Sequence, residues 1–104
     1  MRSPLPAAPV VFVESDLADL IPAYLSHRWA DLAMAHKLLQ AQDYERLARM
    51  GHRIRGSASP YGFGQLGEIA ENLEEAARQR DRAAVMSQLA RFDSFLRTVR
   101  IEYI

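Results

Sequence analysis

The chain has 104 residues, of which 49% are apolar and 25% are charged, and its formal net charge at pH 7 is +0. This length fits one soluble globular domain with a modest core, and the neutral charge argues against a nucleic-acid binder, which is normally basic. The chain has no cysteine and no apolar stretch near the roughly 20 residues of a membrane span, so we expect no disulfide, no thiolate metal site and a cytoplasmic location.

The chain begins with a segment that is a poor helix former. Three prolines fall within residues 1–9 and favour an extended, mobile tail. The next residues, 10–13, are all β-branched or aromatic and form a short β-prone run. We therefore expect an N-terminal tail over residues 1–14 and a single domain over residues 15–104.

A short helix and then a long one are expected next. Ser15 or Asp16 can cap a short helix over residues 16–21. Pro22 fits the first turn of the following helix, where its missing N–H has no partner to lose. That helix is expected to run to about residue 42, with an apolar stripe on Leu25, Trp29, Leu32 and Leu39.

Three more amphipathic helices follow. Asp43 is a plausible N-cap for the first of them, Ser59-Pro60-Tyr61-Gly62 ends it, and Asp81 can cap the last. Their inward residues are expected to be Leu47, Met50, Gly51, Ile54 and Ala58, then Leu66, Ile69, Ala70, Leu73 and Ala77, then Val85, Leu89, Phe92, Leu96 and Val99. Long helices with short connections predict an all-α antiparallel four-helix bundle with a short extra N-terminal helix.

The two ends of the chain have similar character. Residues 10–13 and residues 99–103 are rich in β-branched and aromatic side chains. In an even-numbered up-down bundle the chain ends lie at the same end, so we expect the two runs to lie close together as a two-stranded antiparallel pair packed on the bundle. The alternative is that the last helix continues to about Ile101 and the first run stays irregular.

The helix after Asp43 carries the most informative motif, His52-Arg53-Ile54-Arg55-Gly56-Ser57-Ala58. An imidazole is a nucleophile, a cation one helical turn later can meet incoming negative charge, and a glycine beside it leaves room for a partner. These features suit a side chain that carries a phosphoryl group. His52 lies off the apolar stripe, and we expect a partner to dock on its small or cationic neighbours Ala48, Arg49, Gly56 and Ser59.

The motif resembles the phosphoacceptor motif of histidine-containing phosphotransfer (HPt) domains, H-x-x-K-G-[SA]-x-x-x-x-G. Arg55 replaces the commoner lysine and keeps its charge. The residues in register are His52, Gly56, Ser57 and Gly62. Further similarity to the family lies in residues 20–25, 42–47, 61–63, 73–77 and 95–101, so the resemblance covers about residues 15–100.

The resemblance also implies a partner for the imidazole. In HPt domains a Gln or Glu twenty-two positions after the histidine often accepts a hydrogen bond from it, and Glu74 stands at that position. The alternative for Glu74 is a solvated ion pair with Arg78 one turn later on the same helix. Glu71, one turn earlier, is the second candidate for the orienting role.

The resemblance implies a phosphorelay intermediate rather than a complete enzyme. The chain has no ATP-binding motif and no carboxylate cluster for Mg²⁺, so it should carry no cofactor. His52 would accept a phosphoryl group from the aspartyl phosphate of a response-regulator receiver domain, which supplies Mg²⁺, and pass it to another receiver. The expected partners are receiver domains and a hybrid histidine kinase, with neither nucleic acid nor membrane, and the chain is expected to be a monomer.

Two other functions stay open at this point. The chain could be the phosphoacceptor domain of a chemotaxis-type kinase, or a receiver-binding bundle without phosphotransfer. The charges of two neighbouring helices also have two interpretations: ion pairing within the domain, or a basic rim that meets the acidic pocket of a receiver. The charged residues concerned are Arg46, Arg49, Arg53 and Arg55 on one helix and Glu68, Glu71, Glu74 and Glu75 on the next.

Overall fold

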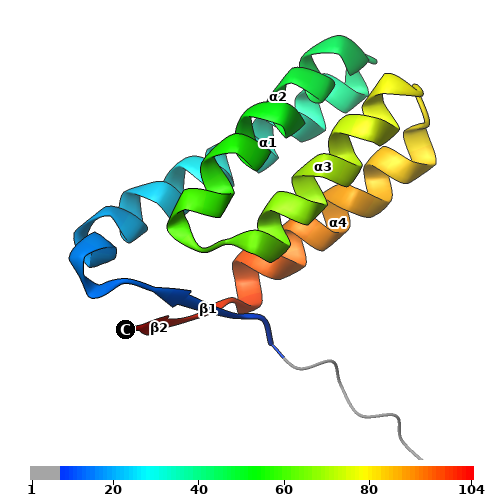
Figure 1. Ribbon diagram of the computed structural model, residues 1–104. Coiled ribbons are helices and arrows are strands. Elements are labelled where there is room, and N and C mark those ends of the chain that lie inside the picture. The colour runs from blue at the N-terminus through cyan, green and yellow to red at the C-terminus, as the bar shows by residue number, and fades with distance from the viewer. Residues whose placement is uncertain (1–7) are drawn as a thin grey trace, which may run out of the picture.

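The computed structural model describes residues 8–104, so the first seven residues of the expected tail lie outside the described residues. Within this part of the chain, four α-helices lie side by side with roughly aligned axes, and a pair of short strands lies at one end of them (Figure 1). None of these helices is long and apolar enough to span a membrane. In chain order the elements are β1 (Val10–Val13), η1 (Ser15–Leu20), α1 (Ile21–Gln40), α2 (Tyr44–Ala58), η2 (Ser59–Tyr61), α3 (Gly64–Arg78), α4 (Arg82–Thr98) and β2 (Arg100–Tyr103).

The start and the end of α1 have local causes. The segment expected to form a short helix is a 3₁₀ helix, η1, which leads directly into α1. Pro22 lies in the first turn of α1, as predicted. The helix ends at Gln40, two residues earlier than expected, because Gln42 turns the chain with a φ of 57°.

The buried face of α1 differs from the predicted stripe. Leu32 and Leu39 are buried, but Trp29 is 38% exposed and Leu25 is only partly buried. Tyr24 and Arg28 take the buried positions instead, each one residue earlier than the predicted residue. Tyr24 packs its ring against Phe63, whose centroid is 5.1 Å away, so a contact with a distant part of the chain decides which side of α1 faces inward.

The other three helices follow the sequence prediction closely. The backbone N–H of Arg46 donates to the Asp43 carboxylate at 3.1 Å, and that of Ala84 donates to Asp81 at 3.0 Å, so both expected N-caps form. All the predicted inward residues of α2, α3 and α4 are buried except Val99. Val99 is extended and only partly buried, because α4 ends at the residue before it.

The two strands lie together, as expected, but the predicted antiparallel direction is wrong. β1 and β2 are parallel, with Val11 beside Ile101. Figure 1 shows the reason: β2 leaves the end of α4 and crosses the end of the helices toward η1, and β1 must run the same way to enter η1. The pair packs on the bundle through Val11 and Val13, which are buried.

The connection between α2 and α3 is fixed by a glycine. Gly62 has a φ of 85°, a left-handed conformation that side chains disfavour, and its N–H donates to the carbonyl of Ser59 at 2.9 Å. A Cβ at this position would lie 2.7 Å from the carbonyl oxygen of Phe12 in β1. The lack of a side chain at Gly62 therefore lets this turn close against the strand pair.

Candidate functional site

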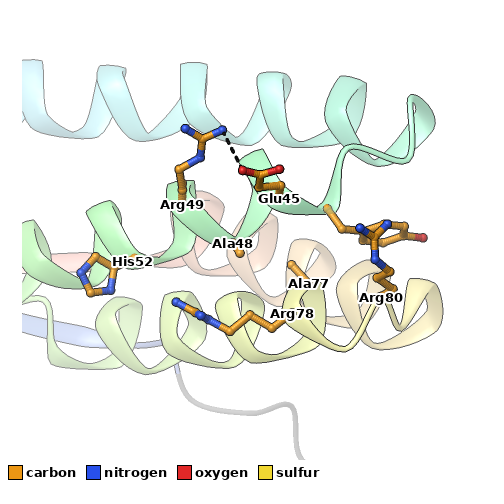
Figure 2. A pocket seen from close by; sticks show the side chains of 8 residues that line it. Glu45, Ala48, Arg49, His52, Ala77, Arg78 and Arg80 are labelled. Carbon is orange, nitrogen blue, oxygen red and sulfur yellow. Dashed lines mark ion pairs between the residues drawn. The ribbon is translucent and has the colours of Figure 1, made fainter.

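α2 presents His52 to solvent because its apolar residues occupy other positions around the helix. Leu47 and Ile54 are fully buried, whereas the side chain of His52 is 68% exposed. Figure 2 shows the imidazole ring on the side of α2 that borders α3. The ring is thus open to a partner in solution and close to side chains of the neighbouring helix.

The neighbour that α3 places beside His52 is Glu74. The Nδ1 atom of the imidazole lies 3.3 Å from Oε2 of Glu74. The Glu74 side chain is only 9% exposed, since it lies at the edge of the α2–α3 contact. The same carboxylate also accepts a hydrogen bond from the guanidinium of Arg78, one turn later on α3. The two alternatives for Glu74, contact with the histidine or with Arg78, therefore coexist in the structure.

The charge state of Glu74 follows from these contacts. The hydrogen bond from Arg78 holds the pKa of Glu74 below its ordinary value of 4.5, and the positive charges of Arg78 and of a protonated His52 act in the same direction. Burial of the carboxylate acts against them and is outweighed. Glu74 is therefore ionised at neutral pH, and an ionised carboxylate can only accept hydrogen bonds.

Arg55 lies one turn after His52, on the same face of α2. Its Nη1 atom is 3.7 Å from a carboxylate oxygen of Glu71 and 3.9 Å from Oε1 of Glu74, and its side chain is 47% exposed. These distances are longer than hydrogen bonds, so the guanidinium keeps donors free for another anion. Of the two glutamates considered from the sequence, Glu74 touches the imidazole and Glu71 faces Arg55.

The four residues expected to dock a partner all lie on α2 or directly after it. Gly56 and Ser59 are exposed, and no heavy atom lies within 4 Å of the place where a Cβ of Gly56 would stand. Arg49 has a side chain that is 70% exposed, whereas Ala48 is 9% exposed. Gly56 therefore leaves open space beside Arg55, and Ala48 lies deeper between the helices.

A groove between α2 and α3 extends from His52 toward the start of α2 (Figure 2). Its lining includes the small side chains of Ala48 and Ala77 and three arginines, Arg49, Arg78 and Arg80. Within the groove one carboxylate, that of Glu45, lies 3.7 Å from Arg49. On the opposite side of His52, toward Arg55, a second hollow has a lining of mixed charge, in which Arg55 and Arg78 lie among Glu71, Glu74 and Glu75. The imidazole thus lies between a mainly cationic groove and a hollow of mixed charge.

A buried arginine links the motif to α1, and no local pattern in the sequence indicates it. Arg28 is 7% exposed, and its Nη1 atom donates to Oγ of Ser57 at 3.1 Å. Its Nε atom lies 2.9 Å from Asp31, whose other oxygen lies 2.8 Å from Arg53. Ser57 of the motif therefore ties α2 to α1 and does not face the imidazole.

Comparison with known proteins gives one match. The model of the Hpt domain family matches residues 19–102, which is most of the chain. No curated protein and no solved structure matches it. Among residues 8–104 no group of three or more histidine, cysteine, aspartate or glutamate side chains is arranged to hold a metal ion.

Proposed function

Because this chain belongs to the Hpt domain family, whose members carry phosphoryl groups in two-component phosphorelays, we propose that His52 is its phosphoacceptor. Nε2 of the imidazole forms a bond to the phosphorus of an aspartyl phosphate on a receiver domain, and the bond from phosphorus to the aspartate oxygen breaks. The aspartate leaves as a carboxylate. The phosphohistidine then passes the group to the aspartate of a second receiver by the same exchange in reverse.

The contact between His52 and Glu74 is the observation that carries this proposal. An ionised carboxylate 3.3 Å from Nδ1 favours the neutral tautomer whose proton is on Nδ1. In that tautomer Nε2 holds a lone pair and is the nucleophile. Because the ring is 68% exposed, this nitrogen can approach an aspartyl phosphate on another protein.

Arg55 supports the transfer through its charge. Its guanidinium lies one turn from His52 and has donors free of short hydrogen bonds, so it can turn toward the phosphoryl oxygens. The receiver supplies Mg²⁺, which neutralises most of the charge that develops on the transferred group. The chain needs no cofactor of its own for this step.

The receiver docks on the exposed face around His52. Gly56 leaves room for the backbone of the receiver, and Ser59 borders the contact. Arg49 and Ala48, which line the groove between α2 and α3, contact the receiver on the side of that groove.

The domain acts as a monomeric antiparallel four-helix bundle. It is a phosphotransfer mediator in the cytoplasm, and a separate hybrid histidine kinase supplies the ATP site.

The test is transfer from a phosphorylated receiver domain. The wild-type chain should gain a label that is lost in acid and survives base, as phosphohistidine is. His52→Gln should gain none while its melting temperature stays close to wild type, since the side chain is exposed. His27→Gln is the matched control, because it removes another exposed histidine. Label on His52→Gln would overturn the proposal.

A second variant separates docking from chemistry. Gly56→Leu should still take label from phosphoramidate, a small donor, but should take it much more slowly from the receiver because leucine fills the open space. Ala83→Leu, at an exposed position in the first turn of α4, is the control and should behave as wild type. Equal receiver rates for Gly56→Leu and wild type would exclude docking on this face.

A further inference from the structure

Gly51, the residue before His52, lies where α2 approaches the backbone of α3 closely. A Cβ built on Gly51 would lie 2.8 Å from the carbonyl oxygen of Ala70 and 2.9 Å from the backbone nitrogen of Glu74. It would also lie 3.1 Å from Cβ of Glu74. Two of these atoms are backbone and the third is the root of a side chain, so no rotamer change can relieve the contact.

We infer that Gly51 is a positioning residue that sets the place of the Glu74 carboxylate beside the imidazole. The atoms that a methyl group would push away include the backbone nitrogen and Cβ of Glu74 itself. Any shift of α3 that relieves the contact therefore moves the side chain that touches His52 Nδ1. Gly51 and His52 are neighbours on α2, so the glycine that sets the distance to α3 and the imidazole that contacts Glu74 belong to the same helix.

The other helical glycines near this interface make no comparable approach. A Cβ on Gly67 would lie 3.7 Å from that of Ala58, which is an ordinary contact. Glycine is also a poor residue for the middle of a helix. The close approach explains why position 51 is a glycine. The atoms that a side chain there would contact belong in part to Glu74, the carboxylate beside the imidazole.

This inference rests on the proposed role of His52, but its test needs no phosphotransfer. ¹⁵N NMR of the unphosphorylated protein reports which imidazole nitrogen carries the proton. In wild type we expect the His52 proton on Nδ1. Gly51→Ala should shift the tautomer toward the proton on Nε2, by as much as Glu74→Ala does. The double variant Gly51→Ala/Glu74→Ala should show no further shift beyond Glu74→Ala, because the glycine acts through the carboxylate.

Gly67→Ala is the matched control and should keep the wild-type tautomer. If Gly51→Ala lowers the melting temperature yet leaves the tautomer of His52 unchanged, Gly51 is a packing residue only and the inference is wrong. If Gly51→Ala is largely unfolded, the same spectra are recorded in sucrose, which favours the compact state, and are judged by the same criterion.

Phosphorylation by phosphoramidate gives an independent readout. We expect Gly51→Ala to take label about tenfold more slowly than wild type, the lower end of what loss of an imidazole-orienting partner costs at metal sites. A wild-type protein that takes no label from any donor would exclude the proposed function. It would leave the tautomer result, and thus the role of Gly51 as a spacer, intact.

Discussion

Glu74 is the residue that connects the charged side chains of the site. It lies almost fully buried between α2 and α3 and touches both the imidazole of His52 and the guanidinium of Arg78. A buried carboxylate without such partners would resist ionisation. Arg78 therefore has an indirect part in the site, since its hydrogen bond keeps Glu74 an acceptor for the proton on Nδ1.

The lowered pKa of Glu74 predicts how stability depends on pH. Because the folded state holds this pKa below its ordinary value of 4.5, the ionised form stabilises the fold above that pH. The contribution is lost as the pH falls through the folded pKa. Glu74→Gln should lower the free energy of unfolding by about 1.5–3 kcal/mol at pH 7, as for a lost hydrogen bond to a charged group.

The check is to measure the free energy of unfolding of wild type and of Glu74→Gln by denaturant unfolding at several pH values. The difference in free energy of unfolding between the two proteins should be largest above pH 4.5. It should become smaller in more acidic solution, where Glu74 becomes neutral like glutamine. A difference that stays constant down to strongly acidic pH would show that the charge of Glu74 does not stabilise the fold.

Arg55 should affect the rate of transfer and not the fold. Arg55→Ala is expected to slow transfer from a receiver about tenfold, less than the loss of a buried donor costs because this side chain is half exposed. Arg55→Lys should keep most of the rate because the charge remains. Arg53→Ala is the matched control, since Arg53 is on the same helix but pairs with Asp31. Equal single-turnover rates for the two alanine variants would exclude a special role for Arg55.

At the scale of elements, the predictable parts are those with local causes. The stripes of α2 and α3 follow from apolar residues at helical spacing, and the N-caps Asp43 and Asp81 from their own short-range hydrogen bonds. The buried face of α1 differs from the predicted stripe because Tyr24 and Arg28 are buried by contacts with residues far along the chain. No spacing rule within α1 contains that information.

The candidate site also has a part that could be predicted from local sequence and a part that could not. The motif around His52 was visible in the sequence because its residues lie within one stretch of α2. Glu74 was found only through the resemblance to a family, and the structure then placed it at the imidazole. The close approach at Gly51 and the bond from Arg28 to Ser57 depend on how helices pack, so the sequence could not predict them.

The turn between α2 and α3 carries a prediction at this scale. Gly62→Ala should lower stability by about 1–3 kcal/mol, because alanine resists the positive φ and its Cβ would meet the carbonyl oxygen of Phe12. A domain of this size should then melt at least 4 °C lower. Thermal unfolding followed by circular dichroism measures this, with Gly64→Ala as the control because its Cβ would meet open space. An unchanged melting temperature for Gly62→Ala would show that the turn tolerates a side chain.

Over the whole molecule, the first and last segments of the described chain pair with each other at one end of the helices. The backbone N–H of Arg100 donates to Pro9, that of Ile104 donates to Val13, and that of Ser15 donates back to Ile104, each at 2.9 Å. His52 lies on α2, and the strands do not contribute to the hollows beside it. The strand pair therefore lies at one end of the bundle and leaves the face around His52 open.

The parallel direction of these strands decides how the molecule bears mechanical tension. If the chain is stretched between Pro9 and Ile104, β1 is drawn toward its first residue and β2 toward its last. The strands are then forced to slide past each other, so their bridging hydrogen bonds carry the load together. In an antiparallel pair the same two points would lie at one end of the ribbon, and the bonds would open one after another like a zip. The parallel orientation of β1 and β2 thus means that tension between these two points loads the strand pair in shear.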